Sequence, residues 1–150
     1  MISGDLASGT AQQAFRRKMQ QRQASPVLRG FSAREIRQGL AYSALDEVAR
    51  TLALTQDVLL RVLGISERTL QRRRRNGQLS SAESDRLWRF VHIYQVALPA
   101  FENQQADAVA WLTTPNDRLG GDTPVAHLDT EPGMRLVEQM LTSIHFLTPS

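Results

Sequence analysis

The sequence predicts an all-α protein, and two observations lead to this fold class. Apolar residues recur at the three- and four-residue spacing of amphipathic helices in the segments after residue 30, and Ser or Thr precedes several of these segments as a potential N-cap. No run of useful length alternates between apolar and polar residues, as a half-buried strand would, and no internal repeat is found. We therefore expect a chain of mostly short helices.

Residues 32–75 predict four short helices, each preceded by a residue whose side chain can cap free backbone N–H groups. These N-caps are Ser32, Ser43, Thr55 and Ser66. Glycine, or an Asn-Gly pair, ends three of the helices, at Gly39, Gly64 and Asn76-Gly77. The second and third helices carry inward apolar stripes, which comprise Leu45, Val48, Ala49 and Leu52 in one and Val58, Leu59, Val62 and Leu63 in the other.

A longer helix is expected from Ser80, where Glu83 completes a capping box. Its core seam comprises Leu87, Val91, Tyr94, Leu98 and Phe101. Pro99 lacks a backbone donor, so a kink or break is expected there. Shorter helices follow at 105–113 and after Thr123-Pro124. We expect both tryptophans, Trp88 and Trp111, in the core.

The last helix is expected to begin at Thr130 and is apolar over a wide arc. Its apolar residues are Leu136, Val137, Met140, Leu141 and Ile144. One side of such a helix can face the local core while another side faces a partner, or both sides can be buried. Gly120-Gly121 is expected to form a turn with positive φ before these helices rather than a phosphate-binding loop.

Composition excludes several classes of protein. The 150 residues include no cysteine, which rules out disulfides, thiolate zinc sites and a cysteine nucleophile. No apolar run approaches the roughly 20 residues of a membrane helix, and the first 30 residues lack the apolar core of a signal peptide. The three histidines lie far apart, and the paired acids face apart or cap helices. We expect a cytoplasmic protein with no membrane partner, no catalytic residue, no metal and no cofactor.

Charge is distributed unevenly along the chain. Residues 1–75 carry 13 Arg and one Lys against six acids, a net charge of +8, whereas residues 76–150 carry four Arg against nine acids, a net charge of −5. The basic half suits a polyanion, and arginine favours bidentate contacts to phosphate or guanine. We expect a flexible basic arm at 1–30, a DNA-binding domain at 31–77 and a helical interaction domain at 78–150.

Residues 55–75 are typical of a helix-turn-helix. Gly64 opens the turn, Ile65 fills it, Ser66 caps the second helix and Leu70 anchors that helix inward. A lone domain of this kind binds DNA weakly, so we expect a homodimer on a repeated or palindromic site.

Candidate DNA contacts lie on the second helix of this motif. At about 100° per residue, four side chains point away from Leu70 towards base edges, namely Arg68, Gln71, Arg72 and Arg75. Arg73 and Arg74 flank the buried side, where they reach phosphates or pair with acids. Ser66 and Thr69 are further phosphate contacts near the amino end of the helix. The alternative is that the arginine run forms a solvated face or an RNA-binding patch.

The sequence resembles the Xre/MbcA/ParS type of antitoxin over residues 39–144. The segments that carry the resemblance are 64–74 (GISERTLQRRR), 79–87 (LSSAESDRL), 111–124 (WLTTPNDRLGGDTP) and 129–133 (DTEPG), followed by Val137 and Leu141. The third segment is the most specific, because helix-turn-helix segments are shared with many regulators.

The resemblance implies a two-domain, all-α antitoxin that dimerises, represses its own operon by binding promoter DNA and neutralises a cognate RES-domain toxin. Toxins of this type consume NAD or transfer ADP-ribose from it. The resemblance also implies that the final helix and tail block the toxin's active site; the residues concerned are Val137, Leu141, Ile144, His145, Phe146, Leu147 and Thr148. Here 145–147 stand where the family usually has a glycine and a short extension. The alternative is a stand-alone transcription regulator whose second domain serves dimerisation or ligand sensing.

Overall fold

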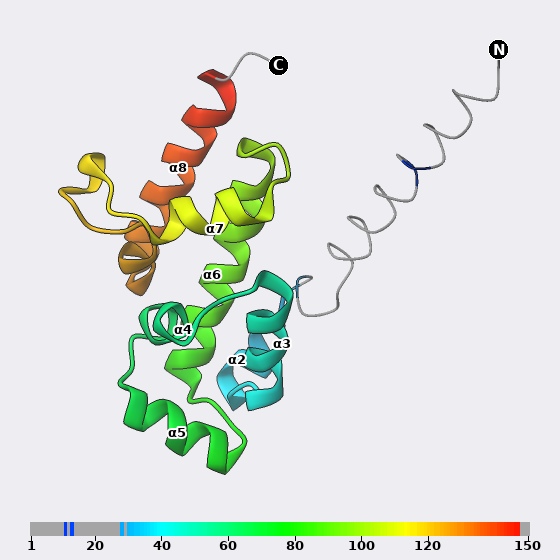
Figure 1. The fold of residues 1–150 in the computed structure, drawn as a ribbon. Helices are drawn as coiled ribbons and strands as arrows, with labels where there is room; N and C mark the ends of the chain where they lie inside the picture. Colours follow the sequence, from blue (N-terminus) through cyan, green and yellow to red (C-terminus); the bar gives the residue numbers. More distant parts are fainter. Residues whose placement is uncertain (1–10, 12, 14–27, 29, 148–150) are drawn as a thin grey trace.

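The computed structural model describes Ala11, Gln13, Leu28 and residues 30–147 (Figure 1). Its helices are α2 (Ala33–Gln38), α3 (Tyr42–Leu52), α4 (Gln56–Leu63), α5 (Glu67–Asn76), α6 (Ser81–Ala100), α7 (Gln105–Thr113) and α8 (Glu131–Leu147), with the 3-10 helices η2 (Asp117–Leu119) and η3 (Val125–Asp129). Within the described residues, extended backbone pairs only at an isolated bridge between Ala41 and Gln78. The all-α prediction is confirmed.

Four of the expected N-caps are present. The side-chain oxygens of Ser32, Thr55, Ser66 and Ser80 each accept a hydrogen bond from the backbone N–H three residues later, at 3.1–3.4 Å. Each cap satisfies one of the free N–H groups at a helix start, so these four helices begin where local chemistry alone would start them.

The expected cap at Ser43 is wrong. Helix α3 begins at Tyr42, after Ala41, and has no side-chain cap. The backbone N–H of Tyr42 donates instead to the carbonyl oxygen of Gly77 at 2.9 Å, and the N–H of Leu79 donates to the carbonyl of Leu40 at 2.9 Å. A segment remote in sequence therefore supplies the acceptor for this helix start.

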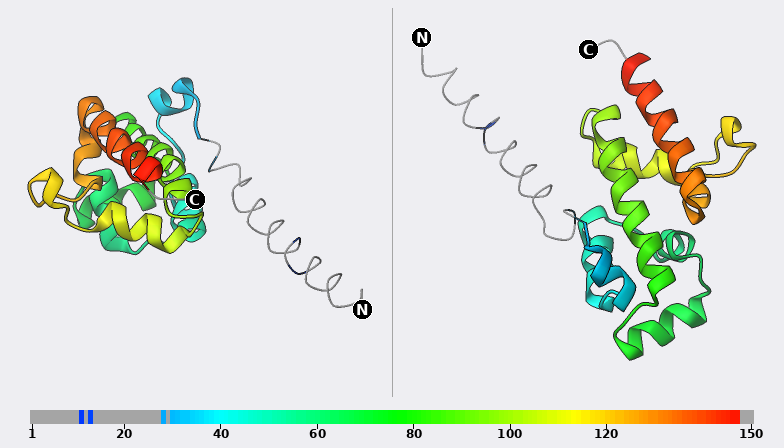
Figure 2. Two further views of the ribbon diagram at one scale, coloured as in Figure 1. Left: turned by 90° about the horizontal axis from the view of Figure 1, so that it is seen from above. Right: turned by 180° about the vertical axis from the view of Figure 1, so that it is seen from behind.

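Helix α6 forms the centre of the molecule (Figures 1 and 2). It packs against α2 and α4 towards its amino end and against α7, η3 and α8 further along. The side chains of Leu87, Phe90 and Ile93 are fully buried, within one core cluster that includes residues from α3 to α8. Helix α6 therefore packs against helices of both expected domains. The domain boundary expected after residue 77 stays a prediction.

Helix α6 ends one residue beyond Pro99, where the sequence predicted a kink or break. The helix continues through Pro99 to Ala100, and the chain then turns through Glu102 and Asn103, which have φ of 55° and 60°. The expected seam residue Phe101 lies beyond the helix and is only half-buried.

The two tryptophans lie at the margin of the core, which corrects the expectation that both are buried. Trp111 is half-buried, and its ring centroid lies 6.0 Å from that of Phe101. Trp88 is half-buried on α6 and stacks on His92, with ring centroids 5.2 Å apart.

Two helical segments of the carboxy-terminal half, η3 and α8, begin after the expected threonines. The Thr123 hydroxyl accepts from the N–H of Ala126 at 3.2 Å, and the Thr130 hydroxyl accepts from the N–H of Gly133 at 3.1 Å. A Cβ at Gly133 would lie 2.0 Å from the carbonyl oxygen of His127. Glycine therefore lets the first turn of α8 approach η3, and α8 then runs alongside α6 (Figure 2).

The expected basic arm lies largely outside the described residues. Leu28, within the range 1–30, is 4% exposed and belongs to the core cluster. The folded body therefore includes this residue, before the expected boundary at 31.

Candidate functional site

Helices α4 and α5 form the expected helix-turn-helix. Gly64 adopts a left-handed conformation with φ of 65°, and its N–H donates to the carbonyl oxygen of Leu60 at 2.8 Å. Ile65 is half-buried in the turn, Ser66 caps α5, and Leu70 is fully buried. The turn, cap and anchor therefore lie where the sequence placed them.

A side chain at position 64 would meet a neighbouring arginine as well as an unfavourable backbone conformation. A Cβ there would lie 1.7 Å from a guanidinium nitrogen of Arg86, a residue of the second turn of α6. The Arg86 side chain therefore brings α6 into contact with the turn of the helix-turn-helix. A β-carbon would displace the arginine and would also strain the positive φ.

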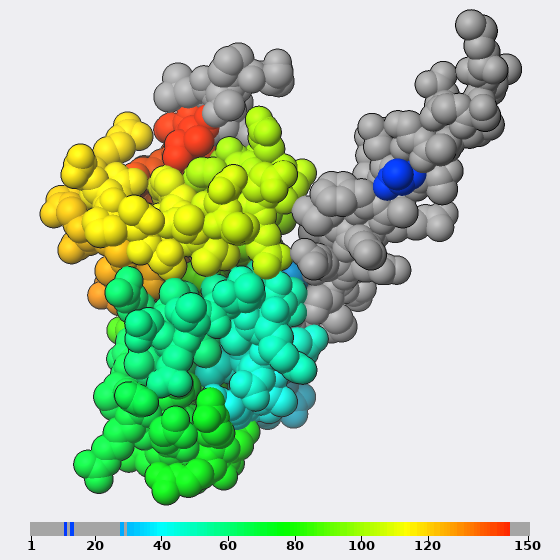
Figure 3. Space-filling view, viewed as in Figure 1, coloured from blue at the N-terminus to red at the C-terminus, as the bar shows by residue number. Residues whose placement is uncertain are grey.

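The outward side of α5 carries three exposed arginines, and we call them the arginine face: Arg68, Arg72 and Arg75. No hydrogen bond or ion pair joins them to another residue in the part of the chain that the structure describes. Gln71 and Thr69 are half-buried beside them, and the exposed Ser66 hydroxyl donates to the Thr69 hydroxyl at 3.1 Å. Helix α5 lies at one end of the molecule (Figure 3). Its free guanidinium groups are therefore available to an acidic partner.

Arg73 belongs to the same run but points towards the protein. Its Nε donates to Glu83 Oε1 at 2.8 Å and its Nη2 donates to Oε2 at 3.1 Å. Glu83 also completes the predicted capping box, since the N–H of Ser80 donates to Oε1 at 2.9 Å. Of the two roles that the sequence left open for Arg73, the structure favours pairing with an acid.

Arg74 is held against α3. Its Nε donates to the hydroxyl oxygen of Tyr42 at 3.2 Å, and its guanidinium carbon lies 5.7 Å from the centroid of that ring. This hydrogen bond raises the pKa of Arg74 above its ordinary value. Although Arg74 is exposed, its guanidinium group therefore makes two contacts with Tyr42, a hydrogen bond and a cation–π contact.

The Arg73–Glu83 pair sets the ionisation of a buried carboxylate. Burial acts to raise the pKa of Glu83, but the hydrogen bonds from Arg73 and the Ser80 backbone outweigh it, so the net pKa lies below the ordinary value. The hydrogen bond to Glu83 in turn raises the pKa of Arg73. Both groups are therefore charged across the neutral range.

This shift predicts how stability depends on pH. Because the pKa of Glu83 is lower in the folded protein, its stabilising contribution is complete above the unfolded value of about 4.5 and is lost as pH falls through the folded value. We expect the wild type to lose more unfolding free energy than Glu83→Gln between about pH 7 and about pH 3, because glutamine does not titrate. Urea unfolding midpoints at a series of pH values measure the difference. Parallel pH profiles would show that Glu83 is not stabilised by the pair.

The candidate toxin contacts on α8 divide between its faces. Val137 and Leu141 are 0% and 1% exposed, so they fill the domain's own core; this corrects their assignment to a partner surface. Ile144 is half-buried. The side chains of residues 145–147, and Thr148 altogether, lie outside the described residues.

The outer face of α8 carries an apolar residue that the sequence did not single out as a contact. Leu136 is 43% exposed, the highest exposure of any large hydrophobic side chain in the described residues. Gln139 and Ser143 are exposed and follow it at helical spacing. Because Leu136 and Val137 are adjacent in an apolar pattern, only packing against α6 distinguishes the buried face from the exposed one.

A polar contact also attaches α8 to α6. His92 Nε2 lies 2.6 Å from Glu138 Oε1, and the His92 ring stacks on Trp88. The His92 side chain is therefore engaged in packing and in a contact between two helices. His127 Nε2 lies 3.4 Å from Oδ2 of Asp122, which belongs to the loop before η3. The sequence did not predict an acid beside this histidine.

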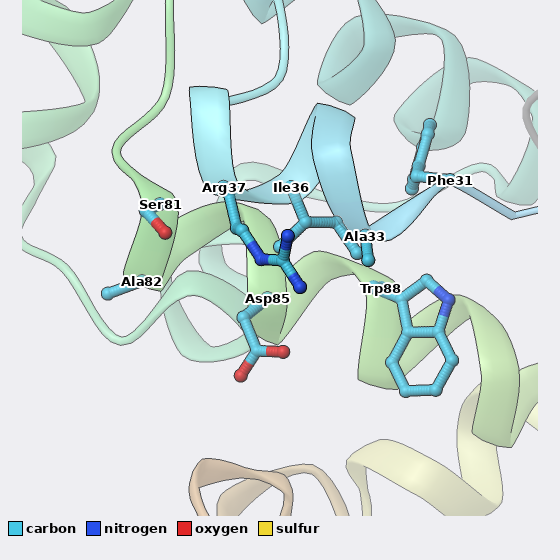
Figure 4. A pocket seen from close by; sticks show the side chains of 8 residues that line it. All are labelled: Phe31, Ala33, Ile36, Arg37, Ser81, Ala82, Asp85 and Trp88. Carbon is cyan, nitrogen blue, oxygen red and sulfur yellow. The ribbon is translucent and has the colours of Figure 1, made fainter.

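A mainly apolar groove of about 740 Å³ lies between α2 and the start of α6 (Figure 4). Phe31, Ile36 and Trp88 supply its apolar side chains, while Arg37 and Asp85 supply charged groups. The Asp85 carboxylate also pairs with Arg89 at 2.8 Å. None of the sequence-predicted DNA or toxin contacts lines this groove.

The described residues contain neither a metal-binding cluster nor a membrane-spanning helix. No group of three or more His, Asp and Glu side chains there is arranged to hold a metal ion. No helix there combines the length and apolar character needed to cross a membrane.

Two family models match the chain. Residues 32–92 match the antitoxin Xre-like helix-turn-helix domain, and residues 97–145 match the antitoxin Xre/MbcA/ParS C-terminal toxin-binding domain. The first match covers α2 to α5 and the first part of α6, and the second extends from the end of α6 into α8.

Curated proteins named Antitoxin Xre are similar to this chain. One from Yersinia enterocolitica is 32% identical over 99 residues, which are 65% of this chain and 67% of the relative. One from Photorhabdus laumondii is 31% identical over 99 residues, with the same shares. One from Pseudomonas putida is 41% identical over 78 residues, which are 51% of this chain and 48% of the relative.

Proposed function

The chain belongs to the Xre family of antitoxins, with a helix-turn-helix domain and a toxin-binding domain, and we propose that it binds promoter DNA through one end and a RES-domain toxin through the other. It is a binding protein, not an enzyme. In this proposal it represses its own operon as a homodimer. It also blocks the toxin's active site with the carboxyl end of α8 and the residues beyond.

The DNA-binding role rests on the arginine face. Arg68, Arg72 and Arg75 are exposed on a helix that is fixed by a cap, a turn and a buried anchor. Arginine donates two parallel hydrogen bonds to the N7 and O6 atoms of guanine, and an α-helix fits the major groove of B-form DNA. A solvated arginine run would not need a fixed helix, so this geometry favours base recognition.

The toxin-binding role rests on the position of α8. The carboxyl end of α8 and helix α5 lie at opposite ends of the folded body, as Figure 1 and the right-hand view of Figure 2 both show. A toxin bound at the far end of α8 would therefore leave α5 free for DNA. This separation is the observation that carries the proposal of two independent activities in one chain.

The toxin partner is tested by co-expression with the product of the neighbouring reading frame, which this proposal expects to be a RES-domain toxin. We expect the toxin alone to deplete cellular NAD and stop growth, and the antitoxin to restore both. Restoration by Arg72→Ala to the same extent would show that neutralisation does not depend on repression. If NAD and growth are the same with and without this chain, the protein is a regulator and the proposed toxin is not its partner.

A further inference from the structure

Glu83 is the one charged residue that is buried in the described part of the chain, with 6% of its surface exposed. Its carboxylate accepts hydrogen bonds on both oxygens, from Arg73 Nε, from Arg73 Nη2 and from the N–H of Ser80. These donors come from α5 and from the start of α6. A buried charge of this kind is tolerated only when its partners are fixed, so the orientation of Arg73 is fixed with it.

The pair supplies what the apolar anchor of α5 lacks. Leu70 holds α5 by burial of its apolar side chain alone. The free energy gained by such burial depends on the buried area and not on the direction of the contact. Arg73 follows one turn later on the same inward side, and its bidentate contact has a preferred direction. Two adjacent attachments of different kinds, one apolar and one directional, restrict rotation of α5 about its own axis.

Rotation of α5 is the motion to which base recognition is most sensitive. The arginine face projects from the opposite side of the same helix, so a small rotation displaces the guanidinium groups that would reach base edges. Hydrogen bonds to bases weaken steeply with poor geometry, whereas attraction to the phosphate backbone hardly depends on it.

We propose that Arg73 is a positioning residue for DNA recognition: its bidentate pair with Glu83 fixes the angle at which α5 presents Arg68, Arg72 and Arg75. This inference rests on the proposed DNA-binding function. It assigns Arg73 on α5 and Glu83 on α6 to the same task, which is to orient α5. Arg73 is then excluded from the residues that touch the nucleic acid.

Two conservative variants distinguish positioning from direct contact. Arg73→Lys keeps the charge but loses the bidentate geometry. Glu83→Gln weakens the pair, while glutamine is still accepted at this position of a capping box, so the start of α6 is retained. Each is compared with the wild type in binding to its own promoter fragment and to a scrambled fragment, at several salt concentrations.

Positioning predicts that both variants lose about tenfold in preference for the promoter fragment. Their binding to scrambled DNA and their salt dependence should stay close to those of the wild type, because no phosphate contact is removed. Direct contact predicts otherwise: Arg73→Lys would bind nearly as the wild type does, and Glu83→Gln would bind more tightly, since it frees Arg73 to contact DNA.

Arg72→Ala serves as the reference for a residue that touches DNA, with a shallower salt dependence expected. Thermal melts of each variant show the folded fraction at the binding temperature. Wild-type promoter preference in both Arg73→Lys and Glu83→Gln would overturn the positioning role, and so would tighter promoter binding by Glu83→Gln. If the wild type itself does not distinguish the two fragments, the proposed DNA-binding function fails first and the positioning role fails with it.

Discussion

Removal of residues 145–150 is expected to abolish toxin neutralisation while leaving promoter binding unchanged. The buried residues that attach α8 to the body, Val137, Met140 and Leu141, precede the deletion, so the shortened helix keeps its core contacts. The pair between His92 and Glu138 also precedes it. The truncated protein should therefore remain folded and lose only the segment proposed to enter the toxin's cavity.

The measurement pairs two assays on the same proteins. Growth and cellular NAD in cells that produce the toxin report neutralisation, and promoter-fragment binding reports the DNA-binding end. Arg72→Ala is the reciprocal control, because it should lose promoter binding and keep neutralisation. Full neutralisation by the truncated protein would place the inhibitory contact elsewhere on the chain, for example on the exposed face around Leu136. Loss of both activities would show that residues 145–150 support the fold.

The helix starts could be predicted because N-cap chemistry is local. Ser32, Thr55, Ser66 and Ser80 each satisfy an N–H three residues away, and a distance of three residues can be read from the sequence. The start of α3 could not be predicted in this way. Its first N–H bonds to Gly77, which lies 35 positions later in the chain, so no local pattern contains its acceptor.

The division of α8 into a buried and an exposed face could not be predicted for a different reason. Its apolar residues span an arc wide enough for either face to be buried, and the stripe alone does not say which one meets α6. Packing buries Val137 and Leu141 and leaves Leu136 exposed. The pairing of Arg73 could be predicted only in part. Helix geometry places both Arg73 and Arg74 beside the buried side, but only the position of Glu83 on α6 shows which of the two pairs with an acid.

The double substitution of Arg68 and Arg72 by alanine is expected to remove most of the preference for promoter DNA. Each side chain is exposed on α5 and makes no hydrogen bond or ion pair within the described residues, so its loss should cost little stability. A bidentate contact to a base contributes about 1–3 kcal/mol of discrimination, so two of them predict about 2–6 kcal/mol. That range corresponds to a loss of roughly 30-fold or more in the ratio of specific to non-specific binding.

The matched control removes the same two charges from elsewhere on the surface. Arg34 on α2 and Arg50 on α3 are exposed, and the double substitution of both by alanine changes net charge equally. Electrostatic attraction to DNA depends on charge, whereas base recognition depends on the position of the side chain. Only the α5 variant should therefore show a lower ratio of specific to non-specific binding. An equal loss in both double variants would mean that the arginines of α5 act through charge alone. The helix-turn-helix would then attract nucleic acid without reading its sequence.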